Sequence, residues 1–441
     1  DSLGGECLWT GCVPTKALVA SARLAHSMRH ASRLGFEDHD PPIDAARIME
    51  SMRETQRITA HHDDPEKFRD LGIEVIFGEA RVEGPGRVHV GERILGARDT
   101  VIATGSRTRL PRIDGLEAAG WTDHVSFLSQ DRFPSSIAIV GGGAIACEFA
   151  QLLGRFGSRV TLIHRGSELL KREDLDVREA MSALLRGEGV EIRFGTTVDR
   201  VERQGSGRRL HLVAGEQRST IDVEELFIAT GRQGNVENLG LEEAGVRVKD
   251  GFIITDETLR TTAPRIWACG DVHGRLLFTH AAAFEAVSLV RNILFPLPRP
   301  ISYEHLPWSI FTDPELARVG MTEEEARGAI GADDVRVWRT EMKEVDRAVA
   351  DRATGGFLKI VGDRKGKILG AHLFCSQASS LIGSLVLARK RGAGAGDLAR
   401  MVSPYPSMGD AIGKAGALYY QELAASGAGT LARMVASWTH R

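Results

Sequence analysis

The sequence predicts an α/β protein with two related strand-and-helix units, followed by a C-terminal block of mixed α and β structure. One observation is an apolar strand at residues 137–140 that runs into a glycine turn and then a helix. Another is a repeat, because residues 101–106 and 227–232 both read as an apolar strand ending in Ala-Thr-Gly. Two copies of one pattern indicate two related units. A third is the change of pattern near residue 307, where the C-terminal block begins.

Composition restricts the partners of this chain. A length of 441 residues favours about three domains. A formal net charge of -3 gives no basis for binding nucleic acid or an anionic membrane, and no apolar run reaches the length of a membrane span. The five cysteines are too few and too scattered for a secreted disulfide scaffold, so we expect a reducing, cytoplasmic location.

Two of these cysteines, Cys7 and Cys12, are separated by four residues and precede a Pro-Thr-Lys that opens a helix. A thiolate beside a helix N-terminus and Lys16 is stabilised by the helix dipole and the ammonium group, which lower its pKa. The pattern therefore favours a redox-active pair. The alternative is that both cysteines are buried as small hydrophobic residues.

The glycine turn reads G-x-G-x-x-A, with Gly141, Gly143 and Ala146 in the defining positions. Such a turn brings the backbone close to a pyrophosphate, which then lies at the N-terminus of the following helix. A second apolar strand follows at residues 160–163. Strand, turn, helix and strand together predict a dinucleotide-binding unit of the Rossmann type.

The chain resembles the class I pyridine nucleotide-disulfide oxidoreductases. Their pattern G-G-x-C-x4-C-x-P-[ST]-K is filled here by Gly4, Gly5, Cys7, Cys12, Pro14, Thr15 and Lys16. The resemblance implies that FAD lies beside the cysteine pair. It also implies that Cys12 is the thiolate facing the flavin and that Cys7 is the thiol that meets the acceptor.

The resemblance also implies an order of domains. Residues 1–130 form the first part of an FAD-binding domain, 131–251 an NAD(P)-binding domain, 252–303 the returning part of the FAD domain, and 304–441 a dimerisation domain. The family places a strand, a G-x-G-x-x-G turn and a helix before the redox motif, whereas only Asp-Ser-Leu precedes Gly4 here. We therefore expect that about 35 to 40 residues, including the FAD pyrophosphate loop, are missing from this chain.

The FAD contacts that the resemblance implies are Gly5, Ala103 and Thr104 of the first Ala-Thr-Gly turn, Asp271, Thr279, and the backbone of His280 and Ala281. Asp271 would bind the ribitol. The helix that starts near Thr279 would direct its positive end at the ring on which negative charge develops. The alternatives are a plain turn at Asp271 and an ordinary N-cap at Thr279.

The end of the second strand indicates the coenzyme. NAD-binding proteins place an acidic residue there to bind the ribose hydroxyls. This chain has His164-Arg165, then Glu168 and Lys171-Arg172. A guanidinium group favours the 2′-phosphate, so Arg165 predicts NADPH rather than NADH. The alternative is that the loop is simply basic and solvated.

Two further pairs follow from the resemblance. Lys16 is expected to pair with Glu148 between flavin and nicotinamide, where a cation stabilises reduced flavin and thiolate. Near the C-terminus, Tyr405 and Asp410 stand where lipoamide and glutathione reductases have a histidine and a glutamate that the partner subunit presents to the redox pair. Mercuric reductase has a tyrosine there. It also ends in a vicinal cysteine pair, which this chain lacks.

The sequence therefore predicts a homodimeric, FAD-containing, NADPH-dependent oxidoreductase that resembles mercuric reductase. Its acceptor is expected to be a metal ion such as Hg(II) or Cu(II), a quinone or a small disulfide. The alternatives are dihydrolipoamide dehydrogenase and a non-catalytic nucleotide-binding protein. In the dimerisation domain, residues 357–361 and 368–372 predict a β-hairpin, and residues 376–391 and 408–424 predict helices.

Overall fold

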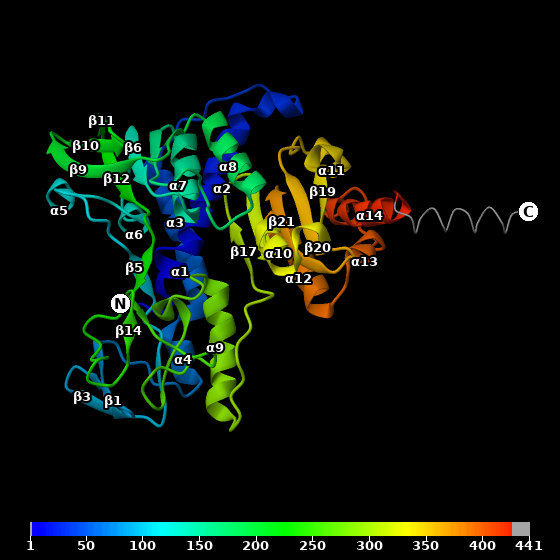
Figure 1. Ribbon diagram of the computed structural model, residues 1–441. Helices are drawn as coiled ribbons and strands as arrows, with labels where there is room; N and C mark the ends of the chain where they lie inside the picture. The colour runs from blue at the N-terminus through cyan, green and yellow to red at the C-terminus, as the bar shows by residue number, and fades with distance from the viewer. Residues whose placement is uncertain (1, 426–441) are drawn as a thin grey trace, which may run out of the picture. The chain divides into compact units, whose positions relative to one another are not determined.

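The computed structural model describes residues 2–425 of the 441-residue chain (Figure 1). Its internal contacts divide the chain into two compact units. The first unit contains the chain up to Ala22, together with Pro42–Ser167 and Gly189–Ser302. The second contains Arg23–Pro41, Glu168–Glu188 and the chain from Tyr303 onward. Each unit has its own sheets and its own hydrophobic core.

The first unit is a mixed α/β structure. Its helices are α1 (Gly5–Trp9), the start of α2 (Cys12–Arg29), α3 (Ala45–Ala60), α4 (Pro65–Asp70), α5 (Leu116–Ala119), α6 (His124–Phe127), α7 (Ala144–Arg155) and α9 (Thr279–Leu294), with the 3-10 turns η2 (His61–Asp63) and η3 (Gly270–His273). Its strands are β1 (Ala80–Gly84), β2 (Arg87–Val90), β3 (Arg93–Gly96), β4 (Thr100–Ile102), β5 (Ser106–Thr108), β6 (Ser136–Val140), β7 (Arg159–Ile163), β8 (Glu191–Arg193), β9 (Thr197–Gln204), β10 (Gly207–Ala214), β11 (Gln217–Val223), β12 (Glu225–Ile228), β13 (Arg232–Gly234), β14 (Val248–Lys249), β15 (Phe252–Ile253) and β16 (Ile266–Ala268).

A parallel sheet of four strands, in the order β12-β6-β7-β8, carries the glycine turn. All four residues of β12 and nearly all of β6 are buried, as expected for a parallel sheet covered on both faces. Its core includes Ala138, Ile163 and Leu226. The helix α7 starts directly after the turn, and an antiparallel sheet β11-β10-β9 follows in the chain. The strands predicted at residues 137–140 and 160–163 are thus confirmed.

The two copies of the Ala-Thr-Gly repeat meet each other. The first follows β4 and the second follows β12. The residues after each turn form β5 and β13, which pair antiparallel, with Ser106 opposite Gly234 and Thr108 opposite Arg232. The strand β4 also pairs in parallel with β16, which leads to Asp271. Segments that are distant in the sequence therefore converge around these two turns.

The second unit is centred on an antiparallel sheet of five strands, in the order β17-β18-β21-β20-β19. These strands are β17 (Pro307–Ile310), β18 (Glu315–Gly320), β19 (Val335–Glu341), β20 (Phe357–Asp363) and β21 (Ile368–Cys375). The helical segments are the end of α2, η1 (Ala31–Leu34), α8 (Leu175–Gly187), α10 (Glu323–Ile330), η4 (Ala332–Asp334), η5 (Met342–Glu344), α11 (Asp346–Ala350), α12 (Ala378–Arg391), α13 (Ala395–Ala399) and α14 (Asp410–Ala425).

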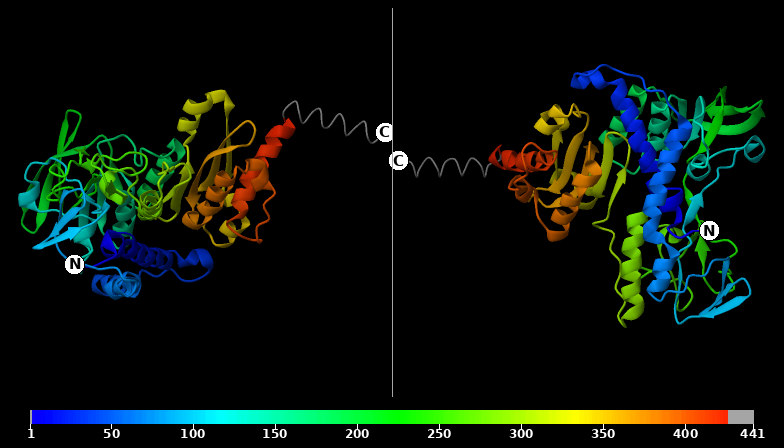
Figure 2. Two further views of the ribbon diagram at one scale, coloured as in Figure 1. Left: turned by 90° about the horizontal axis from the view of Figure 1, so that it is seen from below. Right: turned by 180° about the vertical axis from the view of Figure 1, so that it is seen from behind.

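The core of the second unit lies between this sheet and its helices, and Figure 2 shows α14 in red beside the yellow and orange strands. Leu358 and Leu373 of the sheet pack with Leu385 of α12 and Ile412 of α14. The strands β20 and β21 form the predicted hairpin. The helices α12 and α14 confirm the two helices predicted near the C-terminus.

The segment Glu168–Glu188 is fastened to the sheet of the second unit by buried charges. Lys359 of β20 is almost fully buried, and its ammonium nitrogen lies 2.8 Å from Asp174 Oδ2 and 2.7 Å from Asp176 Oδ1. His372 of β21 is fully buried, with Nδ1 3.3 Å from Asp174 Oδ2 and Nε2 3.5 Å from Glu173 Oε2. We call Glu173, Asp174, Asp176, Lys359 and His372 the buried charge cluster.

Candidate functional site

The redox motif folds as a short helix, α1, that is followed almost directly by α2. Cys7 lies within α1, and Cys12 is the first residue of α2. Gly4 has a φ of 98°, in the left-handed region that favours glycine. Gly11 allows a close approach of the two helices, since a Cβ there would lie 2.9 Å from the carbonyl oxygen of Glu6. The backbone conformation at Gly4 and the close approach at Gly11 therefore explain why the motif has glycine at these two positions.

Hydrogen bonds to neighbouring segments hold this loop. The hydroxyl of the buried Thr15 donates to the Gly11 carbonyl at 2.7 Å. The indole of Trp9 donates to the Leu3 carbonyl at 2.7 Å, and the buried Gln56 of α3 donates to the Trp9 carbonyl at 2.6 Å. The backbone around the cysteines is thus tied to the body of the first unit.

The two thiols are free, and they differ in ionisation. Cys7 donates a hydrogen bond to the Cys12 sulfur, and this bond, the Thr279 hydroxyl and the Lys16 charge together outweigh burial and lower the pKa of Cys12 to about 6. The bond to Cys12 and burial raise the pKa of Cys7 above its ordinary value. Cys12 is exposed and Cys7 half-buried, so the alternative of two buried hydrophobic cysteines is wrong.

Two further predicted residues lie beside this pair. The Thr279 hydroxyl is 3.3 Å from the Cys12 sulfur, and Thr279 is the first residue of α9, whose N-cap is Phe278. The alternative that Thr279 is an ordinary N-cap is therefore wrong. The Lys16 ammonium donates to Glu148 Oε2 of α7 at 2.9 Å. The structure thus brings Cys7, Cys12, Lys16, Glu148 and Thr279 together.

The residues expected to hold FAD fit such a group. Asp271, in the turn after β16, accepts a hydrogen bond from the Ser106 hydroxyl at 2.5 Å and keeps part of its side chain exposed. Burial raises the pKa of Asp271, although Ser106 and Arg232 oppose this. The N-terminus of α9 has no side-chain cap, and nothing lies within 4 Å of a Cβ built on Gly5. A partly exposed carboxylate at Asp271 and the uncapped N-terminus of α9, which begins at Thr279 beside Cys12, could therefore hold such a group.

The structure also shows an ion-pair network that the sequence analysis missed. Glu6 is the residue before Cys7. One of its carboxylate oxygens is hydrogen-bonded to His124 of α6, and the other accepts a hydrogen bond from Arg232 of β13. Arg232 also donates to the Ser106 hydroxyl at 2.7 Å and lies 3.5 Å from Asp271. The available signal was the repeat, because Ser106 and Arg232 hold the same position after the two Ala-Thr-Gly turns.

The three glycines of the coenzyme turn differ in what surrounds them. A Cβ on Gly141 would collide with the Ala229 backbone, and a Cβ on Gly142 would lie 2.5 Å from the His164 ring. Only Gly143, at the N-terminus of α7, faces open space, where a pyrophosphate can approach. His164, at the end of β7, thus packs against the turn and explains the middle glycine.

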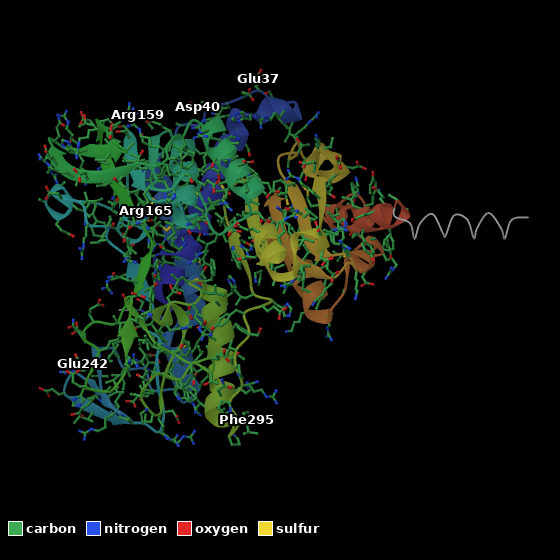
Figure 3. The ribbon with its side chains drawn as sticks, in the orientation of Figure 1. Glu37, Asp40, Arg159, Arg165, Glu242 and Phe295 are labelled. Atoms are coloured by element: carbon green, nitrogen blue, oxygen red, sulfur yellow. The ribbon has the colours of Figure 1, made fainter. Side chains whose placement is uncertain are left out.

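Arg165 follows this histidine and is exposed (Figure 3). Within residues 2–425 its guanidinium makes no hydrogen bond or ion pair, so the group is available to a ligand. Glu168, the nearby acidic residue, is engaged by Arg178 in the second unit.

Tyr405 and Asp410 lie in the second unit, whereas the redox cysteines lie in the first. Tyr405 is 75% exposed, and its hydroxyl donates to Asp346 Oδ2 at 2.7 Å. This hydrogen bond, together with the charge of Asp346, raises the pKa of Tyr405. Asp410 is the first residue of α14 and accepts a weak hydrogen bond from the Ser407 backbone at 3.5 Å.

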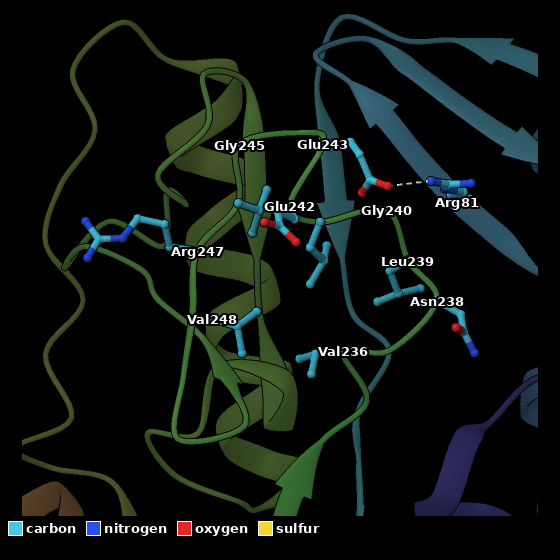
Figure 4. A pocket seen from close by; sticks show the side chains of 12 residues that line it. Arg81, Val236, Asn238, Leu239, Gly240, Glu242, Glu243, Gly245, Arg247 and Val248 are labelled. Carbon is cyan, nitrogen blue, oxygen red and sulfur yellow. Dashed lines mark hydrogen bonds and ion pairs between the residues drawn. The ribbon is translucent and has the colours of Figure 1, made fainter.

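A pocket of about 790 Å³ lies elsewhere in the first unit (Figure 4). Its lining includes Arg81, Asn238, Glu242 and Arg247. Arg81 also forms an ion pair with Glu243, with 2.7 Å between the guanidinium nitrogen and Oε1. None of the predicted site residues lines it. Over the described residues there is no cluster of three or more side chains suited to hold a metal ion, and no helix combines the length and apolar character needed to cross a bilayer.

The described part of the chain thus combines a pair of free thiols, one of them with a lowered pKa, with a glycine turn that joins a parallel strand to a helix. The family model described as pyridine nucleotide-disulphide oxidoreductase matches residues 2–286, and the dimerisation domain of the same family matches residues 306–415. The chain belongs to this family, so the predicted fold and family are confirmed. Its members are enzymes that bind FAD and a pyridine nucleotide, and the second match indicates a homodimer.

Similar proteins fall in several branches. Mercuric reductase of Bacillus cereus is 32% identical over 413 residues, which are 93% of this chain and 65% of that protein. Dihydrolipoyl dehydrogenase of Chlorobaculum tepidum is 34% identical over 423 residues, 94% of this chain and 89% of that protein. A solved Cu(II) complex of the HOCl-induced flavoprotein disulfide reductase RclA from Escherichia coli superposes with a TM-score of 0.84, at 30% identity, over 95% of this chain and 91% of that chain.

Proposed function

We propose that this chain is an NADPH-dependent flavoprotein reductase that delivers electrons through Cys7 and Cys12 to a metal ion such as Hg(II) or Cu(II). The single observation that carries this proposal is the unequal thiol pair. Cys12 is ionised at neutral pH beside Thr279 and Lys16, whereas Cys7 keeps its proton. When bound, FAD supplies the exchange of electron pairs between the nicotinamide and these thiols.

Different residues of the chain would perform the separate steps of this reaction. Asp271 would hold the ribitol of FAD, the N-terminus of α9 would offer its backbone donors to the flavin, and the Lys16–Glu148 pair places a cation beside the Cys12 thiolate. In each turnover the two thiols become a Cys7–Cys12 disulfide. Two electrons go to one acceptor, or to two acceptors that take one each, and the Cys7 proton is released to solvent.

The proton on Cys7 favours a metal acceptor. A disulfide can be attacked only by a thiolate, so Cys7 would need a base. Tyr405 is a poor base, because its ordinary pKa is about 10 and the hydrogen bond to Asp346 raises it. A soft metal cation needs no base, since it displaces the thiol proton when it binds sulfur. The RclA structure is a Cu(II) complex, which supports including copper among the acceptors.

The test is steady-state NADPH oxidation by the purified, FAD-loaded dimer with Hg(II), Cu(II), a quinone, oxidised lipoamide or glutathione disulfide. We expect a metal ion to be reduced fastest. Fast lipoamide turnover would instead identify dihydrolipoamide dehydrogenase, which the Chlorobaculum relative makes the second candidate. A purified protein that takes up no flavin would identify the non-catalytic alternative.

The coenzyme assignment gives one prediction. If Arg165 binds the 2′-phosphate through charged hydrogen bonds, the enzyme should prefer NADPH to NADH by about 10- to 100-fold in kcat/KM. Arg165→Glu should reverse this order. The matched control is Arg159→Glu, which makes the same charge change at the exposed start of β7 (Figure 3) and should leave the ratio unchanged. A wild-type preference for NADH would contradict the assignment.

Tyr405 gives a second prediction, on the premise that the partner subunit presents it to the redox pair. Tyr405→Phe and Asp346→Ala should both slow metal reduction, while the rate of flavin reduction by NADPH stays constant. The first variant removes the donor of the Tyr405–Asp346 hydrogen bond, and the second removes its acceptor. Tyr405→His should raise lipoamide reduction by about 100-fold, since histidine supplies the missing base. Unchanged turnover of all three variants with every acceptor would leave Tyr405 as a packing residue only.

A further inference from the structure

The helix that carries Cys7 has little stability of its own. It contains five residues, and both its N-cap Gly4 and its first residue Gly5 have positive φ angles. An isolated helix of one or two turns is unfavourable in water, because nucleation costs more than its few hydrogen bonds return. Contacts outside α1 must therefore fix the position of Cys7.

Those contacts lie at the two ends of the helix. At the C-terminal end, Gln56 holds the Trp9 carbonyl. At the N-terminal end, the Glu6 carboxylate bonds Arg232 and His124, whose side chains are only 11% and 5% exposed. Burial alone would raise the pKa of Glu6, but the hydrogen bonds from His124 and Arg232 outweigh it and hold this pKa below its ordinary value.

Both partners of Glu6 are themselves fixed. His124 is the first residue of α6 and is buried. Arg232 lies in β13, donates to the Ser106 hydroxyl and carbonyl, and also faces Asp271. An ion pair between immobile, largely buried groups restrains its partner far more than a pair between mobile surface chains. Glu6 therefore joins the redox helix to the rigid junction of the two repeats.

We propose that Glu6 is a positioning residue for the redox pair, because its bonds to Arg232 and His124 hold α1 where the Cys7 sulfur reaches Cys12. This inference rests on the proposed function in taking Cys7 and Cys12 as the working pair. It predicts that the distance between the two sulfurs depends on the Glu6 carboxylate, although that carboxylate does not touch either one.

The affinity for phenylarsine oxide depends on this distance. Its arsenic forms two As–S bonds, and its oxygen leaves as water with the Cys7 proton and one proton from solvent, because Cys12 is already ionised. Tight capture therefore needs two adjacent sulfurs. In the reduced, FAD-loaded dimer, Glu6→Gln should weaken capture about tenfold, in line with the loss of roughly 1.4 kcal/mol of preorganisation. The control is Glu54→Gln, which breaks an exposed pair with Arg57 on α3 and should leave the affinity unchanged.

Other variants separate positioning from a general loss of structure. His124→Leu removes one of the two partners and should weaken capture by a smaller factor, and it decides the question if Glu6→Gln does not fold. A variant with a lower Tm but wild-type arsenical affinity would overturn the proposal, as would equal affinities throughout. Weaker capture in an enzyme that reduces no acceptor would support the positioning role and overturn the proposed acceptor chemistry.

Discussion

Cys12→Ser is expected to abolish the long-wavelength charge-transfer absorption of the reduced enzyme and to lower turnover with any acceptor by about 1,000-fold or more. The reason is that Cys12 is the thiol that is ionised, with a pKa of about 6. The absorption should therefore be present at pH 7 in the wild-type enzyme. It should fade as the pH falls below about 6, because the thiolate is then protonated.

The matched variants are Cys7→Ser and Cys7→Ala. The hydrogen bond from Cys7 is the largest cause of the low pKa of Cys12. A serine hydroxyl can still donate this bond, so Cys7→Ser should keep the absorption while losing turnover. Cys7→Ala has no donor, so its absorption should appear only at higher pH. Identical spectra for Cys7→Ser and Cys12→Ser would show that the two cysteines do not have the proposed separate roles.

Local sequence patterns predicted most of the fold. The strands around the glycine turn, the hairpin β20–β21 and the helix starting at Thr279 each depend on residues close in sequence, where periodicity, turns and caps act. The glycine turn was predicted for the approach of a pyrophosphate. In the structure only Gly143 of this turn faces open space, whereas Gly142 lies against the His164 ring, a contact across 22 positions that spacing alone does not show.

The parts of the site that the sequence did not predict are long-range charge pairs. Glu6 and Arg232 are 226 positions apart, and a lone glutamate and a lone arginine are ordinary surface residues until the fold joins them. Lys359 could not be recognised as a buried ion-pair residue for the same reason. It stands between apolar residues of a strand, and the sequence does not show which acidic segment packs against that strand. We expected residues 168–188 within the NAD(P) domain, but in the structure they belong to the second compact unit.

Lys359 carries the largest expected effect on stability. Lys359→Met should lower the free energy of unfolding of the second unit by about 3–5 kcal/mol, the usual cost of removing one member of a buried ion pair. Methionine fills a similar volume, but it leaves Asp174 and Asp176 without their ammonium partner. Unfolding by guanidinium chloride measures this loss. All variants must be compared at one protein concentration, because the stability of a dimer depends on it. Lys390→Met, at an exposed lysine of α12, is the matched control and should change stability by less than about 0.5 kcal/mol.

The pH dependence of this loss identifies its cause. Burial alone would raise the pKa of Asp174, but His372 and Lys359 outweigh it and lower this pKa below its ordinary value. A carboxylate with a depressed pKa stabilises the fold above its unfolded pKa of about 3.9, and this contribution disappears as the pH falls through the lower folded value. The difference between wild type and Lys359→Met should therefore be full at pH 7 and shrink in acid below pH ~4. A difference that stays constant with pH would mean that Lys359 contributes by packing its alkyl chain rather than by pairing with Asp174.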